Sequence, residues 1–178
     1  MRPAAAALLL GLLGAACAVT TVETPDPASI PSGPIEAQGA RATGPIVELD
    51  SGEAFGTGWR YAIYPSDDDW CTQLETVDLV TTGCGDLLPS GDGAFGSVAQ
   101  GSSEATGVHV IEGTVTEETA TVWLIGENNL RMPALLMPLD DAGLEGHAFL
   151  GFAPADATPT HVMAVKLNGE VLETYELP

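Results

Sequence analysis

Basic residues are scarce in this chain of 178 residues, which has 5 lysines and arginines against 25 aspartates and glutamates. One of the five, Arg2, lies in an N-terminal segment that we expect to be removed, which makes the mature chain one unit more negative than the formal net charge of −20. Nucleic-acid binding needs clustered cations that release counterions from phosphate. We therefore expect no nucleic-acid partner, and anionic lipid headgroups should also repel this domain.

Motifs that carry catalysis are missing from the sequence. There is no Gly-x-Ser-x-Gly elbow for a serine nucleophile, and the glycine-rich stretch 91–96 lacks the lysine and helix of a phosphate-binding loop. We accordingly predict that the protein is not an enzyme and uses no cofactor. An enzyme of an unrecognised class stays open, because scattered residues can form a site that no local pattern displays.

Recognisable metal sites are missing as well. The sequence contains neither a His-Glu-x-x-His pattern nor an EF-hand loop, and His109, His147 and His161 are far apart along the chain. Three histidines on neighbouring strands could converge on zinc. We interpret them instead as ordinary strand residues and predict no metal site.

Long apolar runs are absent except at the N-terminus, where residues 4–16 contain only Ala, Leu and Gly after the positive start Met1-Arg2-Pro3. A run of this length fits the apolar region of a signal peptide and is too short to cross a bilayer as a helix. We therefore predict a signal peptide over residues 1–16 and export of the remaining chain.

The signal segment ends in Leu13-Gly14-Ala15-Ala16-Cys17. This ending resembles the lipobox of bacterial lipoproteins, although Gly14 stands where that family usually has an aliphatic residue. The resemblance implies cleavage after Ala16 and lipidation of Cys17 with palmitate-type acyl chains, which would anchor the protein to a membrane facing the periplasm or the exterior. Ordinary secretion after cleavage near Ala16 or Ala18 is the alternative.

Cysteine is the next rare residue, with three in the chain. Lipid on Cys17 would leave Cys71 and Cys84 as a pair in an oxidising compartment, where disulfides persist. Their spacing has no Cys-x-x-Cys character, so we predict a structural disulfide that stabilises the fold by roughly 3 kcal/mol.

Residues 17–44 and 45–178 differ in composition. The first segment is rich in Pro, Thr, Ser and Ala, which predicts a lipidated N-terminus followed by a flexible tether. The second consists of short apolar runs between turn residues and predicts one all-β domain, a single antiparallel β-sandwich of the Ig-like kind, with a small barrel as the alternative. This pattern resembles small exported bacterial β domains with no assigned activity.

Ten strands are expected in the β domain, and the closing hairpin is the clearest element. The expected strands are Ile46–Leu49, Trp59–Tyr64, Cys71–Thr76, Phe95–Ala99, Val108–Val115, Ala120–Ile125, Ala134–Met137, Ala148–Phe152, Val162–Leu167 and Val171–Leu177. A two-residue Asn168-Gly169 loop would pair Leu167 with Glu170, Val165 with Leu172 and Met163 with Thr174. It would turn Met163, Val165, Leu167 and Leu172 toward the core.

A candidate binding patch follows the second expected strand: Asp67, Asp68, Asp69 and Trp70. A tryptophan beside acidic residues on a turn can stack on a sugar or a protein partner. Packing of Trp70 against the core, solvated carboxylates, and weak calcium binding at this loop are the alternatives.

Together these patterns predict an acidic, lipid-anchored protein of the cell envelope, whose β-sandwich is a non-catalytic module that binds an envelope protein or a surface polymer. The alternative is a lipoprotein that binds a small ligand or a cation.

Overall fold

The computed structural model describes residues 30–178 except residues 68, 90 and 104–106, and its described elements are strands and two short 3-10 helices. The elements are β1 (Val47–Ala54), β2 (Thr57–Ser66), β3 (Asp69–Thr76), β4 (Val80–Gly85), β5 (Phe95–Ser103), β6 (Val108–Val115), β7 (Thr121–Gly126), η1 (Glu127–Asn129), β8 (Arg131–Pro133), β9 (Leu135–Pro138), η2 (Asp140–Ala142), β10 (His147–Pro154), β11 (Pro159–Val165) and β12 (Val171–Glu176). No helix within this described part is long and apolar enough to cross a membrane.

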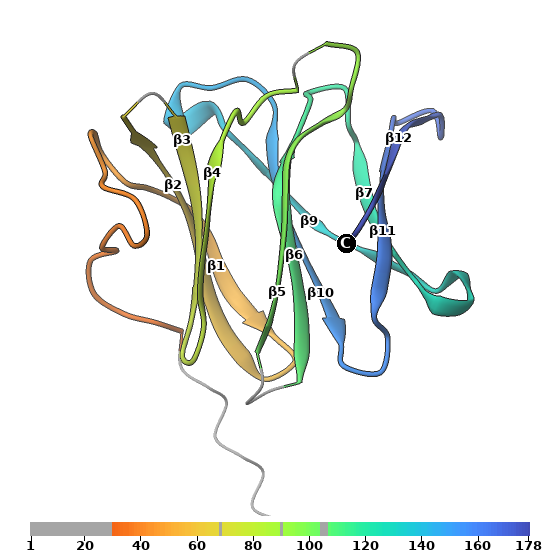
Figure 1. The fold of residues 1–178 in the computed structure, drawn as a ribbon, viewed down its shortest axis with the longest axis horizontal. Coiled ribbons are helices and arrows are strands. Elements are labelled where there is room, and N and C mark those ends of the chain that lie inside the picture. Colours follow the sequence, from red (N-terminus) through yellow and green to blue (C-terminus); the bar gives the residue numbers. More distant parts are fainter. Residues whose placement is uncertain (1–29, 68, 90, 104–106) are drawn as a thin grey trace, which may run out of the picture.

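The strands form three antiparallel sheets that lie side by side (Figure 1). Sheet A has the order β1-β2-β3-β4, sheet B the order β5-β6-β10-β9, and sheet C the order β12-β11-β7-β8. Sheet B is the middle layer, and β6 is buried over most of its length for this reason. A strand covered on both faces carries apolar side chains on both, as β6 does.

Two apolar cores separate the three sheets. Between sheets A and B, alternate residues of β2 meet the A-facing side chains of sheet B: Trp59, Tyr61 and Ile63 pack with Val110 and Leu150. Between sheets B and C the main buried side chains are Phe95, Ile111, Val115, Phe149, Val122, Leu124, Val162 and Ala164. The prediction of an all-β, antiparallel sandwich is confirmed, and the structure adds a third sheet to it.

Strand positions follow the sequence pattern closely where apolar residues are dense. The expected strand Val108–Val115 agrees with β6 residue for residue. The pattern missed β4 and β8, because β4 has the sequence Val-Thr-Thr-Gly-Cys-Gly and β8 has only three residues. Each of these strands is defined by pairing with a neighbour, β3 or β7, and carries little apolar signal of its own.

The disulfide between Cys71 and Cys84 is present, as predicted. The two residues are directly opposite each other on β3 and β4, with their Cα atoms 4.1 Å apart. Cys71 is buried and Cys84 is exposed, so the bond lies at the outer face of sheet A. It ties β4, the strand with the weakest sequence signal in this sheet, to a neighbour with a buried face.

The closing hairpin has the expected pairing of Met163 with Thr174, but a register shift after Ala164 places Val165 opposite Val171 and not, as predicted, opposite Leu172. Of the face predicted for the core, Leu172 packs against the core between sheets B and C, but Met163, Val165 and Leu167 are not part of that core. Val162 and Ala164 are fully buried against sheet B, whereas Leu167 is 93% exposed in the turn. Both faces of β11 carry apolar side chains, so hydropathy did not decide the orientation. The packing of β11 against the filled face of sheet B decided it.

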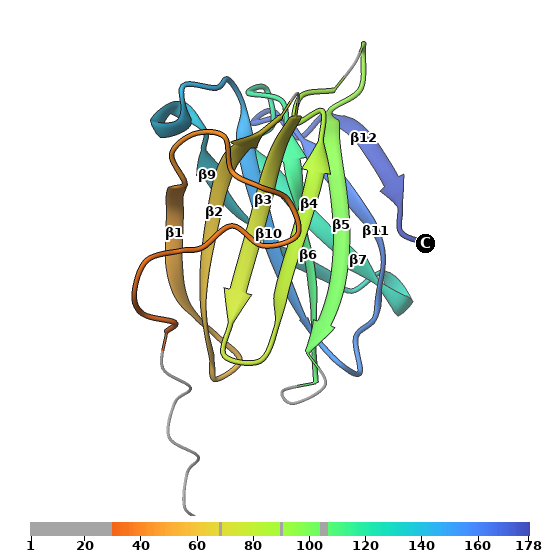
Figure 2. The same ribbon diagram turned by 60° about the vertical axis from the view of Figure 1, so that its left-hand side comes forward.

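Residues 30–44 belong to the folded part of the chain, and the expected flexible tether does not extend through them. Figure 2 shows this segment crossing the outer face of sheet A. The carbonyl of Gly33 accepts a hydrogen bond from Arg60 at 2.6 Å, and that of Gln38 accepts one from the Tyr64 hydroxyl at 2.9 Å. Residues 1–29, which contain the expected signal peptide and Cys17, lie outside the described residues.

Candidate functional site

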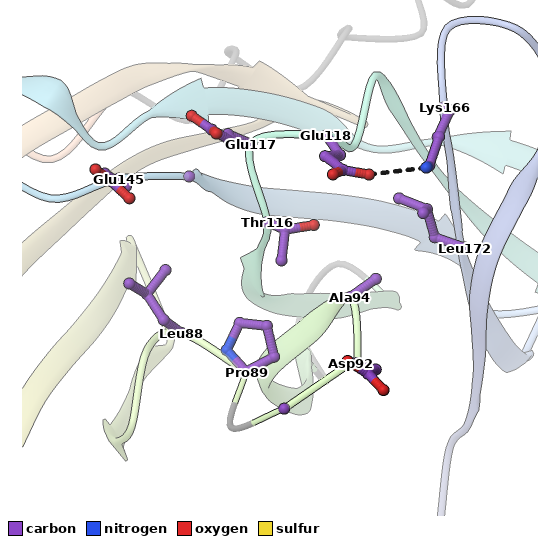
Figure 3. A pocket seen from close by; sticks show the side chains of 13 residues that line it. Leu88, Pro89, Asp92, Ala94, Thr116, Glu117, Glu118, Glu145, Lys166 and Leu172 are labelled. Carbon is purple, nitrogen blue, oxygen red and sulfur yellow. Dashed lines mark ion pairs between the residues drawn. The ribbon is translucent and has the colours of Figure 1, made fainter.

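Four loops meet at one end of the molecule (Figure 1) and line a pocket of about 530 Å³ (Figure 3). They are the β4–β5, β6–β7, η2–β10 and β11–β12 connections, which come from all three sheets. The pocket is lined by Leu88, Pro89, Gly91, Asp92, Gly93, Ala94, Thr116, Glu117, Glu118, Glu145, Gly146, Lys166 and Leu172.

The pocket is strongly acidic. Among the described residues that line it, Lys166 is the one cation, and its ammonium lies 2.8 Å from the Glu118 carboxylate (Figure 3). The hydrogen bond from Lys166 lowers the pKa of Glu118, and the same bond raises the pKa of Lys166. This pairing leaves the exposed carboxylates of Asp92, Glu117 and Glu145 without a compensating cation among the lining residues.

Backbone contacts hold the pocket wall in place. One carboxylate oxygen of Glu173 on β12 accepts hydrogen bonds from the backbone N–H groups of Ala94 and Phe95, at 2.6 and 3.1 Å. This pair of bonds attaches the β4–β5 loop to sheet C. Gly146 has a φ of +92°, and a side chain there would meet the Val115 carbonyl at 2.6 Å, so only glycine lets the loop before β10 pass so close to β6.

The predicted patch on the β2–β3 turn lies outside this pocket. Asp67 has a left-handed backbone with φ +45°, and Asp69 is exposed at the start of β3. Trp70 is half-buried and packs against the core between sheets A and B, which agrees with the core-packing alternative. Asp68 is not among the described residues, and a binding role for this turn stays a prediction.

The three histidines lie on three different strands, β6, β10 and β11. His161 is half-buried and its Nδ1 lies 3.0 Å from the Thr160 hydroxyl, whereas the Nδ1 of His147 is buried. Among the residues that the structure describes, no three metal-ligating side chains gather at one place.

A buried acidic side chain lies between sheets A and B. Glu112 on β6 is 2% exposed, and its Oε1 accepts a hydrogen bond of 2.6 Å from the Thr81 hydroxyl of β4. Its Oε2 and the hydroxyl of Tyr61 are both buried, and the two groups interact with each other and with Thr72. Burial raises the pKa of Glu112 and, with a further contribution from the Glu112 charge, raises that of Tyr61.

An apolar surface lies at the opposite end of the molecule from the acidic pocket. Phe55, in the β1–β2 turn, is 59% exposed and borders a groove of about 360 Å³ that includes Leu135 and Phe152. The groove wall is held by Trp59, whose ring centroid lies 5.8 Å from that of Phe152. The sequence signal for this surface is a Phe-Gly dipeptide between two strands, at a turn where Asn-Gly is the common pair.

Comparison with protein-family models, with curated proteins and with solved structures finds no match to this chain. Two features of the molecule bear on its function: the acidic pocket at one end and the exposed apolar residues at the other.

Proposed function

We propose that this protein is an exported, lipid-anchored component of the bacterial cell envelope, and that its β-sandwich is a non-catalytic module that binds a basic segment of another envelope protein. The acidic pocket carries this proposal. Its three uncompensated carboxylates, Asp92, Glu117 and Glu145, would attract a cationic group, and its four loops come from all three layers of the fold.

The disulfide supports an exported location. Bonds of this kind persist in the periplasm and outside the cell and are rare in the reducing cytoplasm. Cys71 and Cys84 pair with each other, so Cys17 is the one cysteine left for lipid attachment.

A second candidate is a lipoprotein that binds a small cationic ligand in the same pocket. Its volume, about 530 Å³, falls within the range of small-molecule sites. The partner proposal is favoured because the carboxylates are exposed at the rim and are not enclosed, as a carrier would require.

Charge-neutral variants of the pocket test the binding proposal, with hexalysine as the cationic probe. We expect Glu117→Gln/Glu145→Gln to weaken hexalysine binding by roughly tenfold at low salt, because two carboxylates at the site are lost. Glu48→Gln/Glu176→Gln is the matched control, since it removes two exposed carboxylates elsewhere. Equal weakening in both variants would show that only net charge matters and would refute a site at the pocket.

In-cell crosslinking from the pocket rim separates the two candidates. A photoreactive residue at position 117 should capture a discrete protein in the partner proposal, and the same residue at position 48 should not. A small-ligand carrier would give no protein adduct, and its bound amine would appear in the native mass spectrum.

The intact mass of the mature protein tests the anchor. We expect a chain that begins at Cys17 and carries acyl chains, and a Cys17→Ala variant without them. A native chain that keeps Met1, or that has no acyl mass, would contradict lipid anchoring while leaving the pocket test unaffected.

A further inference from the structure

Large apolar side chains are exposed on three separate segments at the end of the molecule opposite the acidic pocket. Ile30 is 45% exposed at the start of the described chain, Phe55 is 59% exposed in the β1–β2 turn, and Val77 is 55% exposed in the β3–β4 turn. Figures 1 and 2 both place these two turns and the first described residues at the same end. Apolar side chains that gather on one surface mark a contact site more often than scattered ones do.

Phe55 is also held in a backbone conformation that disfavours it. Its φ is +52°, and Gly56 follows with φ +75°, the signs of a tight hairpin turn that Asn-Gly fits best. A bulky side chain with positive φ is strained, and exposing its ring to water adds a further cost. Stability of the isolated fold explains neither feature, so the ring is expected to contact something outside the fold.

The chain that precedes the structure determines what lies nearest to this end. Thirteen peptide steps separate Cys17 from Ile30, which limits the distance between them to about 45 Å even when fully extended. Because residues 30–44 are held on sheet A, the described chain begins at Ile30, at the apolar end, and not at Pro45. A lipid on Cys17 would therefore keep the apolar end close to the bilayer.

We propose that the turns carrying Phe55 and Val77 rest on the phospholipid bilayer surface and orient the domain with its acidic pocket pointing away from the membrane. This inference rests on the lipid anchor of the proposed function. The contact is apolar, since the net charge of −20 would repel anionic headgroups. It needs no high affinity of its own, because the anchor supplies a high local concentration.

Anchored vesicles test the contact independently of natural lipidation. The mature chain from Cys17 is coupled through the Cys17 thiol to a maleimide lipid in phosphatidylcholine vesicles, since Cys71 and Cys84 are bonded to each other and do not react. Phe55→Trp and Val77→Trp report from the apolar end. Leu167→Trp is the matched control, because Leu167 is 93% exposed in a tight turn at the opposite end.

Brominated acyl chains should quench roughly half of the fluorescence of the tryptophan introduced at position 55 or 77, because side chains at the headgroup boundary lie near the bromine atoms. The tryptophan at position 167 should lose little fluorescence. Phosphatidylglycerol in the vesicles should reduce this quenching at low salt, and high salt should restore it. Equal quenching at both ends, or none at either, would overturn the proposal.

The same experiment identifies the other occupants of this surface. Quenching at position 55 that vanishes at low protein density would indicate a second copy of the chain and overturn the lipid contact. If the native protein proves unacylated while the coupled chain is quenched as expected, the anchor fails and the apolar contact stands. Phe55→Asn can also be added to the Val77→Trp reporter. If the quenching at position 77 is then unchanged, Phe55 is not part of the contact surface.

Discussion

Glu112 is the residue whose environment differs most from what its type prefers. Burial at 2% exposure disfavours the ionised carboxylate and raises the pKa of Glu112, although hydrogen bonding to Thr81, Tyr61 and Thr72 offsets part of the shift. The raised pKa of Glu112 in the folded state means that folded protein binds this proton more tightly than unfolded chain does. Its contribution to stability is therefore complete below the unfolded pKa and is lost as the pH rises through the folded pKa.

Glu112→Gln should make the protein more stable at neutral pH by about 1–3 kcal/mol, since glutamine keeps an acceptor for Thr81 and cannot ionise. Urea unfolding at several pH values measures this difference. The advantage should shrink as the pH falls below the unfolded pKa of the carboxyl. A pH-independent difference between the two proteins would show that ionisation of Glu112 is not involved.

Phe55 offers a second prediction at this scale, which concerns stability alone. Phe55→Asn should raise the free energy of unfolding by about 0.5–1 kcal/mol, because asparagine accepts positive φ in such a turn. Phe55→Val should lower it, because a β-branched side chain is strained there. Both variants delete the ring, so denaturation midpoints that move in the same direction would assign the effect to the ring and not to the backbone.

Among the elements, the N-terminal segment 30–44 departs most from its sequence pattern. The outer face of sheet A presents Arg60, Gln73 and Glu75, all buried beneath it. Arg60 forms an ion pair with Glu75 and donates from Nε to that carboxylate at 2.6 Å, and Gln73 bonds to the Glu36 carbonyl at 3.0 Å. Segment 30–44 contains prolines and forms no strand pairing, so side chains of sheet A hold it in place through hydrogen bonds to its backbone.

A chain that begins at Pro45 should be less stable than one that begins at Ile30 by roughly 2–4 kcal/mol, because these hydrogen bonds and the cover over the ion pair are lost. Thermal unfolding of the two chains measures the loss. Glu75→Ala within the longer chain is the companion variant, and it should cost about 3–5 kcal/mol by leaving Arg60 buried and unpaired. Identical unfolding of the two chains would mean that the segment contributes no stability.

At the scale of the whole molecule, the net charge of −20 opposes the compact state through self-repulsion. Sodium chloride at about 1 M shortens the screening length to roughly 3 Å, so it should raise the melting temperature at neutral pH. A chaotropic salt at equal ionic strength controls for Hofmeister effects. A melting temperature that falls or stays constant in sodium chloride would show that stabilising ion pairs, such as Lys166–Glu118, outweigh the repulsion.

Prediction from sequence succeeded where the local pattern of residues is informative by itself. The run Val108–Val115, which has large apolar residues at positions 108, 110, 111 and 115, became the buried strand β6, and the two remaining cysteines paired. It failed where neighbours decide. Trp70 packs against the core, as its core-packing alternative expected, and the strand pattern gave no sign that Phe55 would be 59% exposed.

Composition and short-range pattern determined the all-β class, most strand positions and the acidity, because these depend on residues adjacent in the chain. Only the tertiary structure decided that residues 30–44 are held on sheet A, which face of β11 is buried, and that a third layer covers sheet B. The acidic pocket belongs to the same group, since Asp92, Glu117 and Glu145 come from loops far apart in sequence. Distances between such residues are set by the packing of the sheets, which no local stretch of sequence records.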